Sequence, residues 1–230
     1  MLGTMTGWLV GLLLGMRHAL EPDHLAAIST LVADRPSRFR GVFLGAFWGV
    51  GHTTSLFAVG MLLALFDARM PDRLATIFEL GVAVMLIGLG LRAIRRALVE
   101  GRNGVPTEHE HGAHRHSHEG PAGHVHVGGW TLATRPLLIG LVHGLAGSGA
   151  LTALVVADLP DVPSRLIYIV LFGFGSVVGM ASLSGLAGWP LVHLSENRRA
   201  LRILSGATGL FSAMLGVFWG LPLVLELAGR

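Results

Sequence analysis

The sequence predicts an all-α, polytopic membrane protein whose six transmembrane helices form two inverted three-helix repeats. Three observations lead to this prediction. Of the 230 residues, 52% are hydrophobic and only 13% are charged, and the mean hydropathy is +0.63, which is the composition of a membrane protein rather than of a soluble core. The apolar residues gather in long stretches, and parts of the first half of the chain resemble the second half.

Six apolar stretches each reach the ~20 residues that an α-helix needs to cross a bilayer. They cover residues 4–33, 40–66, 74–98, 134–157, 164–190 and 200–228. The first stretch lacks the basic leading segment and the cleavage site of a signal peptide, so we expect it to be retained as a helix. Nearly the whole chain is therefore expected to lie in the lipid bilayer.

Positive charge alternates between the connections. All 17 basic residues are arginines. Twelve lie at the connections after the first, third and fifth stretches, whereas four lie at the other ends of the stretches, namely Arg69, Arg73, Arg165 and Arg230. The positive-inside rule therefore predicts a plasma-membrane protein with those three connections in the cytoplasm and both termini outside. Because the arginines are dispersed at helix ends and form no solvated basic patch, we expect no nucleic-acid partner.

An internal repeat relates the two halves. A shift of 125 residues superposes Leu12-Leu13-x-Gly15-x-x-His18-x-Leu20 on Leu137-Leu138-x-Gly140-x-x-His143-x-Leu145, and a shift of 128 aligns further glycines and places Met180 opposite His52. Three helices is an odd number, so the second set must enter the membrane from the opposite side, as in many transporters. We assign residues 1–98 to the first repeat, 99–133 to a linker and 134–230 to the second repeat.

The first and fourth stretches are expected to be broken helices. Pro22 has no amide hydrogen, and its ring clashes with the carbonyl group four residues earlier, which belongs to His18. In an unbroken helix His18 and His24 would project ~120° apart. A break at Pro22 lets His18, Asp23 and His24 converge and frees backbone carbonyl groups, which is tolerated at membrane depth only inside protein or along a cavity. In the fourth stretch the matching break is the glycine-rich run 144–149.

The convergence of imidazole and carboxylate groups predicts a metal site. Ionisable groups inside a membrane helix are costly, which makes them candidates for a functional site. Imidazole and carboxylate ligands without thiolate suit borderline divalent ions such as Ni²⁺, Co²⁺ or Zn²⁺, among which the site chemistry alone does not choose. There is no cysteine, which excludes disulfides and thiol redox chemistry.

Further residues are candidates for the same site or for the ion pathway. His52 follows two glycines and precedes a polar run in the second stretch, and we assign it as a metal ligand. Glu21, Thr53, His143 and Ser148 are assigned to the metal site or to the pathway, although Glu21 can also simply neutralise Arg17 one helical turn away. Small residues and hydroxyl groups such as that of Thr53 are also ordinary packing material between membrane helices.

These motifs carry a family resemblance. The spacing of His18 and Asp23-His24 resembles the signature of the nickel/cobalt transporter family, whose first motif has the form R-H-A-x-(D/E)-x-D-H. The segment Gly51-His52-Thr53-Thr54-Ser55 is similar to that family's second histidine motif, and residues 143–151 look like the H-G-L-A-G-S segment of the short urease-accessory-type nickel permeases. The resemblance implies that His18, Asp23 and His24 are metal residues of the first motif and that His52 belongs to the second.

A histidine-rich connection joins the two predicted repeats. Residues 109–126 hold seven of the twelve histidines, which are His109, His111, His114, His116, His118, His124 and His126. The segment has no apolar periodicity, so we expect it to be disordered without ligand. Closely spaced imidazoles suit loose binding of transition ions, so this linker is expected to buffer metal in the cytoplasm, to hand incoming metal to a cytoplasmic acceptor or to collect it for export.

The sequence thus predicts a transporter that takes up Ni²⁺ or Co²⁺ as its substrate, without a prosthetic group. Efflux through the same site is the alternative, because the wider superfamily that the chain resembles includes exporters with histidine-rich loops. An intramembrane metallohydrolase would need an open coordination position and a general base, commonly in H-E-x-x-H, and no such motif occurs. A thiol-disulfide electron carrier would need cysteines, and an anion exporter would favour a cationic site.

Overall fold

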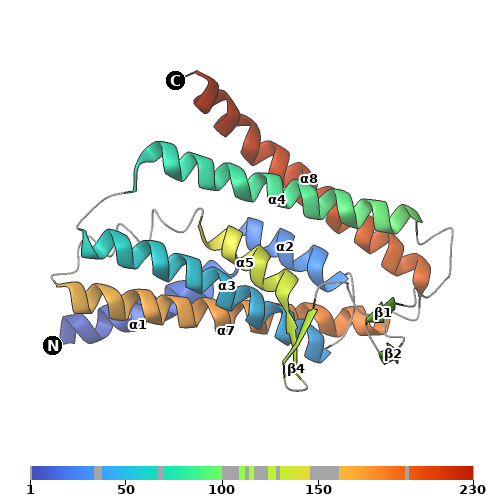
Figure 1. Cartoon of the computed structure of the whole chain (residues 1–230), viewed down its shortest axis with the longest axis horizontal. Coiled ribbons are helices and arrows are strands. Elements are labelled where there is room, and N and C mark those ends of the chain that lie inside the picture. Colours follow the sequence, from blue (N-terminus) through green and yellow to red (C-terminus); the bar gives the residue numbers. More distant parts are fainter. Residues whose placement is uncertain are drawn as a thin grey trace.

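The computed structural model describes residues 2–33, 38–66, 70–99, 109–111, 114–116, 124–127, 130–145, 161–194 and 197–229. Within these ranges the chain forms helices and four short strands (Figure 1). The helices are α1 (Leu2–His18), α2 (Pro22–Ala33), α3 (Arg38–Leu65), α4 (Asp72–Val99), α5 (Thr134–Gly144), α7 (Val162–Leu194) and α8 (Arg198–Ala228).

Four of these helices are long and apolar enough to cross a membrane by themselves. Their apolar spans are Gly41–Leu63, Asp72–Val99, Val162–Trp189 and Arg199–Ala228. By contrast, α1 has 17 residues, α2 has 12 and α5 has 11, all fewer than the ~20 that a crossing needs. The chain is therefore a multi-pass helical membrane protein, and its first predicted crossing is divided between two shorter helices.

The helices run in alternating directions. In Figure 1, α1 begins and α8 ends toward the left-hand end of the molecule, and α7 and α4 also begin there. The ends of α2, α4 and α7 and the beginnings of α3, α5 and α8 lie toward the opposite end. The helix ends that border the connections assigned by the sequence to one side of the membrane thus lie at one end of the structure.

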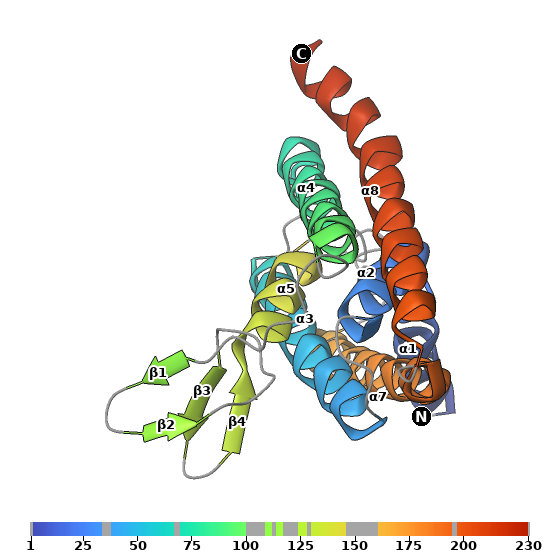
Figure 2. The same cartoon turned by 90° about the vertical axis from the view of Figure 1, so that its right-hand side faces the viewer.

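The helices pack as two groups with α2 between them. In one group α1 packs on α7, α7 on α3 and α3 on α5, while α4 and α8 pair with each other in the second group. Figure 2 shows α4 and α8 side by side above α2 and α5, with α1, α3 and α7 below. Helix α2 contacts α8, α7, α4 and α3, so the helix that carries Asp23 and His24 lies where the two groups meet.

Glycine allows the helix backbones to approach closely in both groups. A Cβ atom added at Gly15 of α1 would overlap the carbonyl oxygen of Phe172 of α7, and one added at Gly140 of α5 would overlap that of Trp48 of α3. Small residues at membrane helix contacts permit such an approach and maximise van der Waals packing. These contacts set the depth at which α1 and α5 sit against their neighbours.

The chain turns sharply between α1 and α2. The amide of Leu20 donates to the carbonyl oxygen of Arg17 at 2.9 Å, and the amide of Glu21 donates to that of His18 at 3.0 Å. Pro22 then begins α2, where its missing amide hydrogen costs nothing because the first amides of a helix have no intrahelical partner. The break predicted at Pro22 is therefore present, as a tight turn that separates two helices.

The outer surface is apolar, as lipid contact requires. Large apolar side chains such as Phe218, which is 81% exposed, cover the faces of α4, α7 and α8 that contact no other described helix. The buried core is smaller and is built mainly from alanine, Trp48, Val82, Leu86 and Met180. In lipid there is no hydrophobic force between helices, so close packing and hydrogen bonds decide which faces meet.

The described part of the histidine-rich connection forms two antiparallel hairpins, which project to one side of the helices in Figure 2. Strand β1 (His109–His111) pairs with β2 (His114–His116), with His109 opposite His116, and β3 (His124–Val127) pairs with β4 (Trp130–Ala133). The disorder that the sequence predicts for this linker without ligand stays a prediction.

Candidate metal centre

Five polar side chains meet at the break between α1 and α2, and all are nearly inaccessible. The exposed fractions are 4% for His18, 7% for Asp23, 1% for His24, 0% for His52 and 1% for His143. His18 ends α1, Asp23 and His24 lie in the first turn of α2, His52 lies in the middle of α3 and His143 lies near the end of α5. The structure thus brings together the first motif, the second motif and the histidine that the repeat suggested.

Within this cluster two overlapping groups could hold a metal ion. His18, His24 and His52 form one, and Asp23, His24 and His143 form the other, with potential ligand atoms in each group within 4.8 Å of one another. His24 belongs to both, and its ring centroid lies 4.3 Å from that of His18 and 4.2 Å from that of His143. The two groups are therefore neighbouring parts of one centre.

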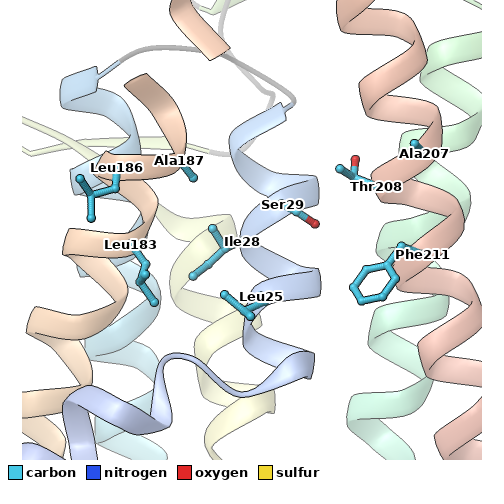
Figure 3. A pocket seen from close by; sticks show the side chains of 9 residues that line it. All are labelled: Leu25, Ile28, Ser29, Leu183, Leu186, Ala187, Ala207, Thr208 and Phe211. Carbon is cyan, nitrogen blue, oxygen red and sulfur yellow. The ribbon is translucent and has the colours of Figure 1, made fainter. Parts of the chain in front are cut away.

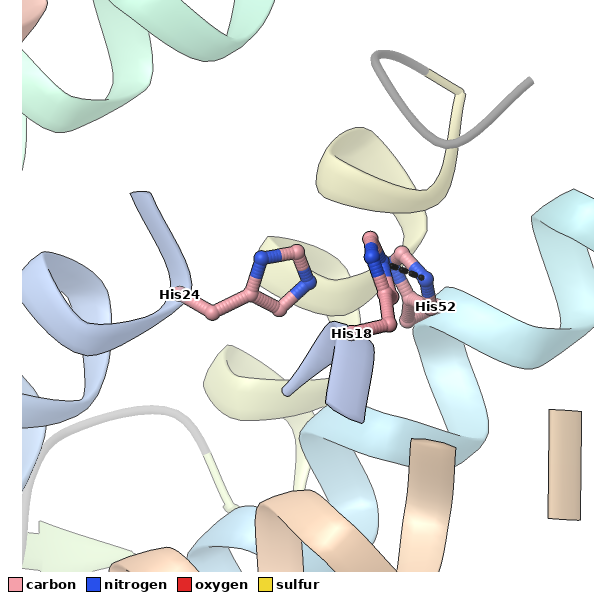
Figure 4. A group of neighbouring side chains, drawn as sticks. All are labelled: His18, His24 and His52. Atoms are coloured by element: carbon pink, nitrogen blue, oxygen red, sulfur yellow. Dashed lines mark hydrogen bonds between the residues drawn. The ribbon is translucent and has the colours of Figure 1, made fainter. Parts of the chain in front are cut away.

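His18 has a different partner at each ring nitrogen. Its Nδ1 lies 2.8 Å from Glu21 Oε1, and its Nε2 lies 3.2 Å from Nε2 of His52. Figure 4 shows these two rings close together, with the ring of His24 beside them. Two imidazole nitrogens that bind one ion at about 2.0–2.1 Å lie about 2.9 Å apart at a right angle and about 3.3 Å apart at the tetrahedral angle. The separation observed fits a shared ion.

Asp23 connects two imidazoles. Its Oδ1 accepts from the backbone amide of His24 at 2.9 Å and lies 3.0 Å from Nδ1 of the same residue. Its Oδ2 lies 2.8 Å from Nε2 of His143, which is 120 positions away in the sequence. The carboxylate therefore joins the beginning of α2 to the end of α5 and contacts both rings.

Three imidazole nitrogens of the centre are buried and lack a hydrogen-bond partner within the described part of the chain. They are Nε2 of His24, Nδ1 of His52 and Nδ1 of His143. Buried polar atoms without a partner are rare because they lose their interactions with water. A bound ion would remove that cost for Nε2 of His24 and Nδ1 of His143, whose other ring nitrogens face Asp23, so these two nitrogens indicate a place for a cation.

Two aromatic rings border the centre. The Trp48 ring centroid lies 5.3 Å from that of His24 and 5.6 Å from that of His143, and the Phe172 centroid lies 5.5 Å from that of His18. The sequence interpretation did not single out Trp48 or Phe172. Trp48 precedes His52 by one helical turn, a spacing that puts both on one helix face and that could have identified it.

The remaining predicted site residues have other surroundings. Glu21 lies beside His18 and is 39% exposed, whereas the Thr53 hydroxyl donates to the carbonyl oxygen of Gly173 at 3.0 Å and joins α3 to α7. Ser148 and His118 lie outside the described residues. The other linker histidines lie in the hairpins, with His109, His111, His114 and His116 in one and His124 and His126 in the other.

A bundle of apolar helices that encloses imidazoles and a carboxylate is characteristic of membrane proteins that handle cations. The family described as "NicO: High-affinity nickel-transport protein" matches residues 5–195. The chain therefore belongs to this family of nickel transporters, whose members are not enzymes.

Individual relatives agree with the family. The chain is 32% identical to the urease accessory protein UreH of Bacillus sp. (strain TB-90), over 91% of this chain and 88% of the relative. It is 28% identical to the Chloroplast protein FOR GROWTH AND FERTILITY 1 of Arabidopsis thaliana, over 96% of this chain and 60% of the relative. A high-affinity nickel transport protein of Cupriavidus necator is 29% identical over 31% of this chain and 20% of the relative. No solved structure matches.

Proposed function

We propose that this chain is a secondary transporter that takes up Ni²⁺, and secondarily Co²⁺, through the buried centre at the break between α1 and α2. The single observation that carries the proposal is the convergence of four imidazoles and one carboxylate inside an apolar helix bundle. The family description and the Cupriavidus necator relative both name nickel, which favours Ni²⁺ as the principal substrate.

The proposed ligands are His18, Asp23, His24 and His52, with His143 as a fifth residue from the other half of the chain. A hydrated ion that enters the centre exchanges water for imidazole nitrogen and carboxylate oxygen. Because ligands must be deprotonated to bind, protons compete with the ion and acidification weakens binding. In this proposal, release follows when movement of the helix groups separates the ligands.

An inverted repeat of two three-helix units, with six crossings in all, is part of this proposal, and reciprocal helix contacts support it. Gly15 of α1 meets the Phe172 carbonyl of α7, and Gly140 of α5 meets the Trp48 carbonyl of α3. Gly140 follows Gly15 by 125 positions and Phe172 follows Trp48 by 124. The contact of α1 with α7 thus repeats in the contact of α5 with α3, as a two-fold axis requires.

Helices α4 and α8 cross at a pair of glycines. A Cβ atom added at Gly90 would lie 2.5 Å from the carbonyl oxygen of Gly209, and one added at Gly209 would lie 2.7 Å from that of Gly90. Gly51 of α3 meets the Leu137 carbonyl of α5, and Gly175 of α7 meets the Leu12 carbonyl of α1. This match favours an offset of 124 rather than 128 between α3 and α7, which puts Ser176 instead of Met180 opposite His52. The proposed repeats are residues 1–98 and 134–230, with 99–133 as the linker.

We place the arginine-rich end of the molecule in the cytoplasm and both termini outside. The connections with most arginines belong to the end where α2, α4 and α7 finish (Figure 1), and basic residues are retained on the cytoplasmic side. This orientation puts the histidine-rich connection in the cytoplasm of a cell whose plasma membrane holds the protein. There it buffers metal near the inner mouth of the pathway and supplies a cytoplasmic acceptor.

The first test of the transport site is nickel and cobalt accumulation in cells that produce the wild-type chain, His18→Ala or Asp23→Asn. Both variants are expected to lose accumulation at normal protein abundance in the membrane. Met214→Leu is a suitable control, since that side chain is 62% exposed on the outer face of α8. Unchanged accumulation in the two site variants would contradict the proposed site.

The direction of transport needs a second experiment, because efflux through the same centre is the alternative. A cytoplasmic loop that collects metal favours efflux. Sealed vesicles of known orientation are loaded with Ni²⁺ or Co²⁺ on one side, with and without an imposed proton gradient. Net movement toward the cytoplasmic face supports uptake. Net movement only away from that face would replace uptake by efflux and leave the site assignment intact.

A further inference from the structure

Glu21 has a geometry that separates it from the rest of the centre. Its Oε1 lies 2.8 Å from Nδ1 of His18, and the side chain is 39% exposed whereas that of His18 is 4% exposed. The contact spans three positions and is closed by the turn in which the Glu21 amide donates to the His18 carbonyl oxygen at 3.0 Å. Backbone and side chain of Glu21 thus both bond to His18.

The sequence also allowed Glu21 to pair with Arg17, one helical turn earlier. Within the described residues the carboxylate forms an ion pair with His18 and none with Arg17. The helix ends at His18, so the regular spacing that would bring Glu21 over Arg17 is lost. The turn before Pro22 instead directs the carboxylate to the imidazole.

This contact decides which nitrogen of His18 is available to an ion. An ionised carboxylate only accepts hydrogen bonds, so the imidazole nitrogen that faces it carries the proton. With the proton on Nδ1, the lone pair lies on Nε2, which points to His52 at 3.2 Å. The opposite tautomer would place a lone pair against the carboxylate and an N–H group where an ion is to bind.

We propose that Glu21 is a positioning residue that holds His18 in the tautomer and ring orientation that present Nε2 to the transported ion. The inference rests on the proposed function of the centre and adds a role for a carboxylate that acts through His18 and does not itself contact the ion. Loss of such outer carboxylate partners typically lowers metal affinity about 10–100-fold.

The test compares Glu21→Gln and Glu21→Leu in the purified full-length chain by equilibrium binding of Ni²⁺ and Co²⁺. Glu21→Leu removes the acceptor and is expected to lower the affinity about 10–100-fold. Glu21→Gln keeps an oxygen that accepts from Nδ1 but lacks the charge, so a smaller loss is expected. Glu79→Gln, a partly buried glutamate of α4 outside the cluster, is the matched control and is expected to bind as the wild type does.

Two further readouts separate positioning from direct ligation and from a merely structural role. The visible spectrum of bound Co²⁺ is expected to be the same in Glu21→Gln and in the wild type, because the set of bound atoms is unchanged. In a His18→Ala background, Glu21→Leu is expected to cause no further loss of affinity, since it acts only through the missing imidazole. An altered Co²⁺ spectrum, or additive losses, would overturn the positioning role.

The outcomes also distinguish this inference from the function on which it rests. A wild-type chain that binds neither ion would overturn the proposed function. Only the role of Glu21 would be overturned if the wild-type chain binds Ni²⁺ and Glu21→Leu binds it equally well. The same holds if Glu21→Leu unfolds at a lower temperature but keeps its affinity for Ni²⁺.

Discussion

The two halves of the molecule share their helix contacts but differ in chemistry. In the first half α1 approaches α7 at Gly15, and in the second half α5 approaches α3 at Gly140 in the corresponding way. Yet His18, Asp23, His24 and His52 all belong to the first half, and the second contributes His143. At the position that the contacts match to His52, the second half has Ser176, whose hydroxyl donates to the Phe172 carbonyl oxygen of its own helix at 3.0 Å.

The difference teaches that packing and ligand chemistry obey separate constraints in this protein. Close backbone contact needs only a small residue at the crossing point, so the same solution serves in both halves. A metal centre needs several convergent ligands at one place, and the proposed ligands come from one half together with a single histidine from the other. Four predictions test how far the equivalence of the halves extends.

The largest expected effect tests the shared packing. Gly15→Ala and Gly140→Ala each place a methyl group on a backbone carbonyl oxygen of a neighbouring helix, and overpacking of this kind costs about 3 kcal/mol. Both variants should give little folded protein in detergent, as measured by size-exclusion chromatography and thermal unfolding. Gly88→Ala is the matched control, because nothing lies within 4 Å of the added Cβ. A stable Gly140→Ala variant beside an unstable Gly15→Ala variant would contradict the equivalence.

The second prediction tests the chemical difference. His52→Ala should lower the affinity for Ni²⁺ by more than the ~10–100-fold that loss of an outer partner costs, because it removes a proposed ligand. Ser176→Ala removes the matching polar group of the second half and should leave the affinity unchanged. Binding is measured by equilibrium dialysis of the purified chain. Equal losses in the two variants would mean that the second half also contributes ligands from α7.

The third prediction compares the buried centre with the histidine-rich connection. Replacing the six histidines of the hairpins and His118 by alanine should remove most of the weakly bound Ni²⁺. Tight binding at the buried centre should stay intact, because no residue of that centre lies in the connection. Titrations at pH 7.5 and pH 5.5 should show weaker binding at the lower pH in both sets, since protonated imidazole has no free lone pair. Loss of tight binding in the linker variant would mean that the buried centre depends on the histidines of the connection.

The smallest expected effect concerns hydroxyl groups that sit side by side on α3. Ser55 Oγ donates to the Leu141 carbonyl oxygen of α5 at 2.7 Å, whereas Thr54 Oγ1 donates to Val50 of its own helix at 2.7 Å. Ser55→Ala should cost about 1 kcal/mol of unfolding free energy, and Thr54→Ser should be near neutral. Thermal unfolding in one detergent measures both. Equal effects would show that the contact of α3 with α5 depends on glycine packing alone.

Much of the architecture follows from local sequence. The apolar stretches predict a multi-pass helical membrane protein, and Pro22 predicts the break that lets His18 approach His24, because both effects depend on neighbouring residues only. The repeat register was harder. Glycine and leucine recur one helical turn apart on the same face, so the sequence pattern allows Met180 opposite His52, whereas the contacts of α1 with α7 and of α5 with α3 favour Ser176.

The sequence by itself determined the class of protein, the helix break and the types of ligand that lie near it. Only the tertiary structure decided which imidazoles share the centre, since Asp23 and His143 are 120 positions apart and meet through the packing of α5 on α3. It also decided which nitrogens of His18, His24 and His143 face a carboxylate. Hydropathy and helix breaks are local properties, whereas ligand convergence depends on how closely distant backbones approach.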